Sequence, residues 1–444
     1  MQKALIYGIG NNYFDNRLWL EHNYEIIGIS DGNEERWGQE VDGRSISCID
    51  SYPEDSYDTV IVTPAKYREI IPEIIRHGVN QKKIHILGEL LSSTDQGRIL
   101  RTCFSITGGL GDDLVALNYI YTFLNYFGIG LFVTDLLLDR GAEAVKEVLG
   151  EKSIFRDISN VSENDIPRRE YDLIIRIVRY PRVLKKNNGK ILRIVPDLVD
   201  YLLLCEKFEI YNPRFFSKDY ESYLAGAFYE MDYGRIRIQQ PDIFGFFELE
   251  ENFMYPIETN TGLIKRWGLK EKQYVTIHYG CEKRNFNGFS TKTWGPQNYR
   301  ELIKLLKERI PKYEIVLVGM DYEKTDDIDN YDKSLVGETS ISELKAVLKC
   351  AYMHVDTEGG LVHLRHAVGG GRSVVLFGPT SNRFYGYSEN MNCRLGTCPV
   401  TCEWVTKDWS HQCAREDGRP VCMESITPTR VMKDVEKILE EDDE

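Results

Sequence analysis

The clearest fold signal in the chain is the segment Cys103-Phe104-Ser105-Ile106-Thr107-Gly108-Gly109-Leu110-Gly111-Asp112-Asp113. A short apolar run with strand character ends in a glycine-rich turn, and the residues that follow, up to 126, predict a helix. A helix that opens after such a turn directs unpaired backbone N–H groups at whatever lies there. This strand–turn–helix order is typical of Rossmann-like α/β domains, which bind ligands at the carboxyl ends of their strands.

The same alternation of strand and helix signals extends to both sides of this segment, which is typical of parallel sheets covered by helices. Strands are expected at 4–7, 25–30, 59–63, 83–87, 103–107, 129–134, 172–178, 274–278, 314–318, 353–356 and 374–377. Helices are expected at 14–22, 66–78, 112–126, 140–149, 296–309, 340–350, 360–369 and 428–441. The tyrosine-rich residues 180–255 give no clear order of elements.

We therefore predict an α/β protein of three units. Residues 1–97 form a Rossmann-like accessory domain that ends in a polar linker at 92–97. Residues 98–255 form a second α/β domain, and residues 256–444 form a third domain with a cysteine-rich segment at 393–422. A chain of 444 residues is long enough to bury several cores without metals or disulfides.

The charge balance limits the function. With 55 Lys+Arg against 69 Asp+Glu the formal net charge is −14, which argues against a nucleic-acid partner but leaves room for a local phosphate pocket. The charge-free residues 114–134 are long enough to span a bilayer, but their polar residues and Gly128 predict a helix and then a buried strand. The N-terminal residues read directly as a strand, without a secretory signal. We expect no transmembrane segment and a cytoplasmic location, or one at the inner face of the membrane with peripheral contact.

A second glycine turn lies in the first unit, at Gly8-Ile9-Gly10-Asn11-Asn12-Tyr13. Asp31 ends the next strand, about where a dinucleotide-binding unit places its ribose-binding acid. Tyr13 replaces the third glycine of that pattern, so two interpretations stay open: bound NAD, or a scaffold without ligand or for another nucleotide. The unit resembles the small Rossmann-like domains appended to bacterial polysaccharide-synthesis proteins.

A third turn, Asp356-Thr357-Glu358-Gly359-Gly360-Leu361-Val362-His363, carries an acidic strand end into a helix start. Soon after comes Phe377-Gly378-Pro379-Thr380, at the same expected edge of the sheet, so both turns line one crevice. Taken alone, Asp112 is most simply a helix N-cap and His363 a structural residue.

These pieces, in this order, resemble glycosyltransferase family 9, the heptosyltransferase-type enzymes of bacterial surface glycans. The matching motifs, within residues 100–435, are Gly109-Leu110-Gly111-Asp112, His278-Tyr279-Gly280, Lys292-Thr293-Trp294-Gly295-Pro296, Val318-Gly319, Leu335 to Ser340, Asp356 to His363 and Phe377 to Thr380. Two departures stand out. The extra residues Thr357-Glu358 leave either Asp356 or Glu358 as the acidic position, and most family members lack the N-terminal unit.

The resemblance implies a GT-B architecture, in which two Rossmann-like domains face each other. It implies an inverting transfer, without a catalytic cofactor or metal, of a heptose or related sugar from a nucleotide-sugar donor. The acceptor would be a glycan, glycolipid or protein in the assembly of lipopolysaccharide, capsule or glycoprotein. Asp112 matches the family's base and Lys292 its diphosphate-binding lysine. The implied donor-binding residues are His278, Gly280, Lys292, Thr339, Asp356, Glu358, Gly359, Gly360, His363, Gly378 and Thr380; a ligand of the accessory domain would contact Gly8, Gly10 and Asp31.

Two alternatives belong to other classes. One is a nucleotide-binding scaffold or regulatory protein that has lost catalysis. The other is a fusion in which residues 1–97 are an active NAD(P)-dependent sugar-modifying domain.

Five cysteines gather near the C-terminus, at 393, 398, 402, 413 and 422. Four of them, Cys398, Cys402, Cys413 and Cys422, have a spacing that suits a structural zinc or iron ion, and some relatives in the family carry a cysteine finger. Unligated thiols and disulfides are the other interpretations. With each interpretation, we expect the segment to have a structural role and to lie far from the catalytic residues.

Overall fold

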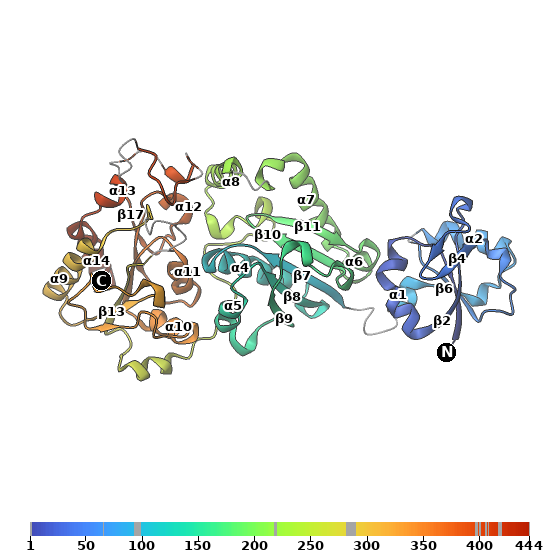
Figure 1. Cartoon of the computed structure of the whole chain (residues 1–444), viewed down its shortest axis with the longest axis horizontal. Helices are drawn as coiled ribbons and strands as arrows, with labels where there is room; N and C mark the ends of the chain where they lie inside the picture. The colour runs from blue at the N-terminus through green and yellow to red at the C-terminus, as the bar shows by residue number, and fades with distance from the viewer. Residues whose placement is uncertain are drawn as a thin grey trace.

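The computed structural model describes residues 2–443, except 65, 93–98, 217–219, 281–289, 396–397, 399–400, 405, 407 and 416–419. The described residues form three sheets, each with its own helices, that follow one another along the molecule (Figure 1). The predicted linker at 92–97 lies outside the described residues, apart from Ser92. Each sheet falls within one of the three predicted units; the domain boundaries themselves stay predictions.

The first sheet has the strand order β3-β4-β2-β1-β5-β6, parallel except for the β3–β4 pair. Along β1, Ala4 and Ile6 pack toward helices α1 and α3, whereas Leu5 and Tyr7 pack toward α2, as the two-residue period of a strand requires. The elements are β1 (Gln2–Tyr7), α1 (Asn11–Asn23), β2 (Tyr24–Ser30), β3 (Glu40–Val41), β4 (Arg44–Ser47), β5 (Thr59–Val62), α2 (Tyr67–Arg76), β6 (Ile84–Ile86) and α3 (Leu87–Ser92).

The second sheet has the order β11-β10-β7-β8-β9, with only the described β10–β11 pair antiparallel. Its elements are β7 (Leu100–Ile106), α4 (Leu110–Phe127), β8 (Phe132–Leu138), α5 (Ala142–Leu149), β9 (Asp157–Asn160), β10 (Leu173–Ile177), β11 (Pro181–Lys186), α6 (Asn188–Ile194), α7 (Leu198–Tyr211) and α8 (Tyr220–Asp232).

The charge-free stretch folds as a helix and then a strand, as predicted. Helix α4 ends at Phe127, and Gly128 takes a left-handed φ of 93°. A short 3-10 turn over Ile129–Leu131 follows, so β8 begins at Phe132 rather than at residue 129. Among the helices that the structure describes, none has the combined length and apolar character needed to cross a bilayer.

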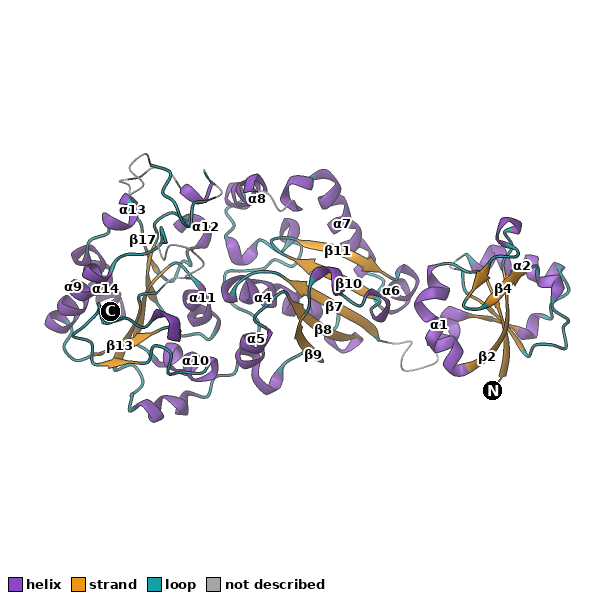
Figure 2. Cartoon of the chain, in the orientation of Figure 1, coloured by secondary structure: helices purple, strands orange, loops and turns teal. Residues whose placement is uncertain are grey.

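The residues 180–255, whose order the sequence did not reveal, are mostly helical (Figure 2). Some of their aromatic side chains pack on α4 and others on one another. The Tyr201 hydroxyl lies 2.6 Å from that of Tyr119, and Phe247 packs against Phe123. Aromatic packing of this kind has no fixed sequence period, which explains why the pattern gave no prediction.

The third sheet has the order β14-β13-β12-β15-β16-β17 and is parallel throughout the described pairs. Its elements are β12 (Tyr274–His278), α9 (Pro296–Arg309), β13 (Glu314–Val318), β14 (Lys333–Ser334), α10 (Ile341–Cys350), β15 (Met353–Thr357), α11 (Gly360–Ala367), β16 (Ser373–Leu376), α12 (Asn382–Tyr385), β17 (Met391–Cys393), α13 (Val421–Glu424) and α14 (Pro428–Asp443).

The second and third domains share one continuous apolar core. Helix α4 packs on α11, and α5 packs on α10 (Figure 1). A smaller apolar cluster at this junction joins Val115 of α4 to Val362 of α11 and to Phe377. The two Rossmann-like domains therefore face each other across α4 and α11, which confirms the GT-B arrangement.

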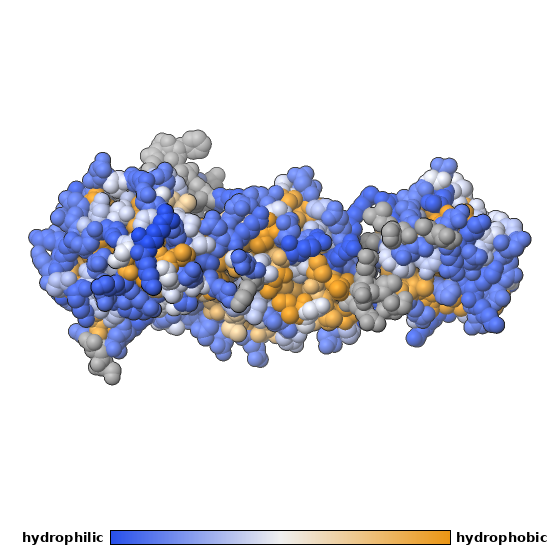
Figure 3. Space-filling view, turned by 90° about the horizontal axis from the view of Figure 1, so that it is seen from below, coloured by the Kyte–Doolittle hydropathy of each residue, from blue (hydrophilic) through white to orange (hydrophobic). Residues whose placement is uncertain are grey.

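Exposed large apolar side chains are frequent in the second domain, and Figure 3 shows apolar surface on this middle part of the molecule. They include Tyr126, Ile129, Leu131, Leu192, Leu203, Ile210, Tyr211, Phe228, Tyr233 and Phe244. Scattered apolar side chains are normal on protein surfaces. Peripheral membrane contact therefore stays a prediction.

Candidate active site

The N-termini of α4 and α11 meet at the junction of the two domains. A Cβ atom built on Gly360 would lie 3.5 Å from the Cβ of Leu110 and 3.6 Å from the backbone nitrogen of Gly111. A Cβ on Gly111 would lie 2.7 Å from the ring of His363. At Gly111 a side chain would clash with this ring, whereas the distances at Gly360 are ordinary van der Waals contacts. Two helix starts, each with a partial positive charge, thus lie side by side.

Asp112 stands at this meeting point, in the first turn of α4. Its Oδ1 accepts a hydrogen bond of 2.8 Å from Nη2 of Arg237, and its Oδ2 accepts a long one of 3.5 Å from the Gly109 N–H. The side chain is 49% exposed, so the carboxylate is accessible to a ligand. Asp112 therefore caps its helix in part, and it also forms an ion pair with Arg237, which is distant in the sequence.

Arg237 lies in the 3-10 turn η10 (Arg237–Gln239) and is buried. Its Nη2 also donates to the carbonyl oxygen of Val178, at 3.3 Å, while its buried Nη1 has no hydrogen-bond partner. An unsatisfied buried guanidinium nitrogen is costly, so a polar ligand atom beside it would be stabilised.

Asp113, the next residue, has the opposite environment. Its side chain is buried, and burial, with smaller contributions from Asp112 and Asp139, raises its pKa to about 7. The two neighbouring carboxyl groups thus differ: Asp112 is open to the cleft, and Asp113 belongs to the core.

The opposing domain contributes a lysine–glutamate pair. Nζ of Lys292 donates to the Glu358 carboxylate and, at 3.2 Å, to the Glu358 carbonyl oxygen. It also lies 5.5 Å from the ring centre of Trp409. Glu358 lies between β15 and α11, at the carboxyl edge of the sheet. Of the two acids left open by the sequence, Glu358 is the one that meets Lys292.

Asp356 is instead part of a buried charge network at the strand ends. His278 donates from Nδ1 to Asp356 at 2.8 Å and from Nε2 to Glu323 at 3.2 Å. Burial alone would lower the pKa of His278, but Asp356 and Glu323 raise it to about 10. Burial would raise the pKa of Asp356, but the nearby histidines, His278 first, lower it. The network is therefore an imidazolium held between two carboxylates.

Gly280 makes room for this network. A Cβ atom at Gly280 would fall 2.0 Å from Oε1 of Glu323. Gly280 thus lies against a protein carboxylate. Thr339 is half-buried in the loop before α10, and its role stays a prediction.

His363 is neutral near pH 7. Its side chain is buried, and burial lowers its pKa to about 4. Its Nδ1 lies 2.6 Å from the Tyr387 hydroxyl. Glu358 and Asp112, one from each domain, raise the pKa of His363 electrostatically, but burial outweighs them.

The turn 377–380 lies between this site and the cysteine-rich segment. A Cβ on Gly378 would lie 2.4 Å from Sδ of Met423, so Gly378 faces the cysteine-rich segment rather than open space. Thr380 is buried, and its hydroxyl has no hydrogen-bond partner. Gly359, by contrast, directly precedes α11 at the meeting of the two helix starts.

Glu403, beside Cys402 in the turn η14 (Cys402–Trp404), reaches into the same site. Its carboxylate accepts a hydrogen bond from the Tyr385 hydroxyl, and burial raises its pKa to about 8. Glu358, Lys292 and Arg237 act on it electrostatically. The expectation that the cysteine-rich segment is remote from the candidate site is therefore wrong for Glu403.

The four cysteines proposed as metal ligands are all buried, and no disulfide joins the nine cysteines that the structure describes. Burial, and then the neighbouring thiols, raise the pKa of Cys422 to about 11 and that of Cys402 in the same direction. Within the described ranges, no group of three or more His, Cys, Asp or Glu side chains is already arranged to hold a metal ion.

In the accessory domain a backbone N–H of the glycine turn donates a hydrogen bond to the Asp31 carboxylate. Asp31 accepts hydrogen bonds from the Ile9 N–H at 3.2 Å and from Nη1 of Arg36 at 3.2 Å. Gly8 has a φ of +90° and packs against Pro64, whereas Gly10 has open space at its Cα. Tyr13 is buried, and its hydroxyl donates a hydrogen bond of 2.9 Å to Asp42.

Sequence reasoning missed Arg237, Glu323 and Glu403. Arg237 belongs to the stretch that gave no periodic signal. Glu323 follows the predicted strand 314–318, so the rule that ligand-side residues cluster at strand ends could have found it. Glu403 follows Cys402 in the cysteine-rich segment, which was interpreted only as a possible metal site.

Two family models match parts of the chain. Residues 1–85 match the family described as C2185-like, N-terminal, and residues 224–414 match glycosyltransferase family 9 (heptosyltransferase). No curated protein matches the sequence.

Solved structures share the fold. A glycosyl transferase family 9 structure from Veillonella parvula DSM 2008 is 13% identical, with a TM-score of 0.51 over 77% of this chain and 98% of that one. The iron-containing dodecameric glycosyltransferase TibC from enterotoxigenic E. coli H10407 is 14% identical, with a TM-score of 0.51 over 77% of this chain and 79% of its own. The chain is therefore a glycosyltransferase that resembles family 9 (heptosyltransferase) over residues 224–414 and the C2185-like N-terminal family over residues 1–85.

Proposed function

We propose that the chain is an inverting glycosyltransferase that moves a sugar, a heptose or a related one, from a nucleotide-sugar donor to an acceptor in bacterial surface glycan or glycoprotein assembly. The observation that carries the proposal is that Asp112, in the first turn of α4, and the Lys292–Glu358 pair, just before α11, lie at the two helix starts that meet at the domain junction.

Asp112 is the proposed general base. Its carboxylate is half exposed, and it takes the proton of the acceptor hydroxyl while that oxygen bonds to the anomeric carbon. The bond from the anomeric carbon to the diphosphate breaks on the opposite face, and its electron pair leaves with the diphosphate. Arg237 holds Asp112 in place through its 2.8 Å hydrogen bond.

Negative charge develops on the leaving diphosphate, on the face of the sugar opposite to Asp112. The N–H groups at the start of α11 and the Lys292 ammonium are the donors available there. In the structure Glu358 holds this ammonium, so a bound phosphate oxygen would compete with that carboxylate. His363, being neutral, can hydrogen-bond a ligand but adds no positive charge.

The comparisons offer one donor to test first. A further structure of TibC, 12% identical with a TM-score of 0.51 over 78% of this chain and 77% of its own, is described as a complex with ADP-D-beta-D-heptose. We take this compound as the first probe, followed by other nucleotide sugars.

The cysteine-rich segment suits a structural metal by its donor chemistry. Thiolates prefer zinc and iron, and Cys398, Cys402, Cys413 and Cys422 are buried and act on one another electrostatically. A metal there would fix the position of the segment that carries Glu403. No step of the transfer runs through it.

Donor hydrolysis tests the proposal without knowledge of the acceptor. The wild type should release the nucleotide diphosphate from its donor, and both Asp112→Asn and Lys292→Ala should lower the rate while the thermal midpoint of unfolding stays within a few degrees. A catalytically inactive scaffold would instead be stabilised by the nucleotide sugar in a thermal-shift assay and show no hydrolysis.

A further inference from the structure

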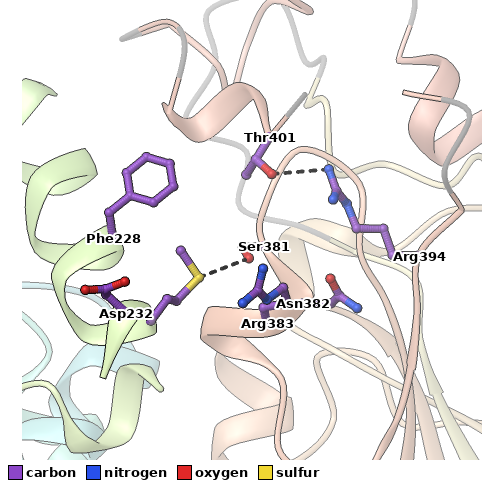
Figure 4. A pocket seen from close by; sticks show the side chains of 8 residues that line it. Phe228, Asp232, Ser381, Asn382, Arg383, Arg394 and Thr401 are labelled. Atoms are coloured by element: carbon purple, nitrogen blue, oxygen red, sulfur yellow. Dashed lines mark hydrogen bonds between the residues drawn. The ribbon is translucent and has the colours of Figure 1, made fainter. Parts of the chain in front are cut away.

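A pocket of about 370 Å³ opens between the second and third domains, in addition to the site around His363. Helix α8 of the second domain forms one wall, and helix α12 with residues 394 and 401 of the third domain forms the other (Figure 4). Its volume is within the range of about 300–1,000 Å³ typical of small-ligand pockets. The lining residues are Phe228, Met231, Asp232, Ser381, Asn382, Arg383, Arg394 and Thr401.

The charges in this pocket favour an anion. Arg383 and Arg394 supply two guanidinium groups against the single carboxylate of Asp232. Nη2 of Arg394 donates to Thr401 at 3.3 Å, which fixes that side chain at the wall. Arg383 is exposed, and within the part of the chain that the structure describes it makes no hydrogen bond or ion pair. A planar guanidinium with free donors binds carboxylates and phosphates well.

The pocket also offers groups that suit a sugar ring. Phe228 lines it on α8 with 51% of its surface exposed, so an apolar ring face can cover it. Ser381 and Asn382 add neutral polar groups for hydroxyls. A site with an aromatic face, neutral polar groups and cations matches a sugar that carries an acidic substituent.

Each wall of the pocket is close in sequence to a residue of the candidate active site. The chain runs from Asp232 to Arg237, the partner of Asp112, and from Thr401 to Glu403. Helix α12 carries Ser381 at its start and Tyr385, the partner of Glu403, at its end. The donor phosphates are expected at α11, so this pocket is left for the other substrate.

We infer that this pocket binds the acceptor and selects a sugar residue bearing a carboxylate or phosphate, held by Arg383 and Arg394 with its apolar face on Phe228. The inference rests on the proposed glycosyltransferase function, since it names the acceptor class for that reaction.

The test is the binding of simple sugars to the full chain, measured by calorimetry or saturation-transfer NMR. Methyl glucuronide and glucose 1-phosphate are the anionic probes, and methyl glucoside is the neutral one. At least one anionic probe should bind tenfold or more tightly than the neutral probe, and the better of the two shows whether the site prefers carboxylate or phosphate. Equal binding of all three, or no binding of any, would overturn the inference.

Substitutions locate the binding. Arg383→Ala should remove the preference for the anionic probe, and Arg383→Lys should restore part of it. Arg309→Ala is the matched control, because Arg309 at the end of α9 forms an exposed ion pair with Glu436 of α14, and neither residue lines the pocket. Unchanged anion binding in Arg383→Ala, or an equal loss in Arg309→Ala, contradicts the inference.

Donor hydrolysis by the wild type separates the two proposals. Hydrolysis without any preference for anionic sugars leaves the proposed function standing and ends the acceptor inference. Anion-selective binding in a chain that hydrolyses no donor refutes the proposed function and leaves a sugar-binding protein.

Discussion

Arg237 donates a hydrogen bond of 2.8 Å to Asp112, a residue 125 positions earlier in the chain. Arg237 is buried, whereas half of the Asp112 side chain faces solvent. The pair therefore anchors an accessible carboxylate from its buried side and leaves the other side free for a substrate. A base in a transferase needs this combination of fixed position and access.

The first prediction compares neighbouring carboxyl groups in α4. Asp112→Asn removes the proposed base and should lower the rate of sugar transfer by about 10²–10⁴-fold. Asp113→Asn is the control, since that carboxyl is buried and does not face the cleft. Steady-state kinetics with a nucleotide-sugar donor measures both. Similar losses in both variants would show that the substitutions act through the helix rather than through a base.

The second prediction concerns stability and pH at Asp113. Its pKa is about 7 in the folded chain, against an ordinary value of 3.8, so between these pH values the folded state holds the proton more strongly. Stability from this group is therefore present at low pH and is lost as pH rises from about 4 to 7. Asp113→Asn should remove this loss, and its free energy of unfolding relative to wild type should rise by about 1–4 kcal/mol across that window. Urea unfolding at several pH values measures it, and a pH-independent difference would contradict the assignment.

The third prediction concerns the imidazolium of His278, whose contribution to stability also falls as pH rises, but over a higher pH range than that of Asp113. Asp356 and Glu323 raise its pKa to about 10, so its contribution is complete below the ordinary value of 6.5 and is lost as pH rises toward 10. His278→Gln should therefore destabilise the chain by about 3–5 kcal/mol at pH 6, and by less at pH 10. Thermal unfolding with a pH series provides the measurement. A penalty that grows with pH would mean that the histidine is neutral.

The fourth prediction tests the cysteine-rich segment. Protein purified without added metal should contain one equivalent of zinc or iron by elemental analysis, and Cys402→Ser should lower that content. Cys48→Ser is the control, because Cys48 lies in the accessory domain and outside the cysteine-rich segment. A chelator should also lower the thermal midpoint. Metal-free wild-type protein with an unchanged midpoint would favour the unligated-thiol interpretation.

The fifth prediction concerns the accessory domain. Asp31 and the Ile9 N–H, which a dinucleotide would need, are bonded to each other. NAD and NADP at millimolar concentration should therefore leave the thermal midpoint unchanged, whereas a nucleotide sugar raises it. A saturable shift with NAD would revive the fused sugar-modifying enzyme as an interpretation.

Much of the fold could be predicted because the strands are short apolar runs with glycine at their ends. The strand Tyr274–His278 and the helix Pro296–Arg309 match the predicted ranges. A run of mostly apolar residues marks the strand, and a proline at the first position marks the start of the helix. Short edge strands such as β3 and β14 were missed, because two residues carry no readable period. The aromatic helices α7 and α8 were missed for the related reason that they are apolar on several faces.

The candidate site was predictable only where a motif marked it. Asp112, Lys292, Glu358 and His363 follow from the family resemblance, and the structure brings them to one junction. Arg237 and Glu403 could not be inferred, because each acquires its partner through packing between distant segments. Local pattern describes a residue's own element and says nothing about which remote element will lie against it.

The bare backbone at Gly111 makes the seam between the two halves unusually easy to manipulate. Because the His363 ring occupies the space where a methyl group would sit, Gly111→Ala would force that ring or the start of α4 to shift without altering a single charge. One added carbon atom would thus disturb the contact between the two domains while every ionisable group is kept.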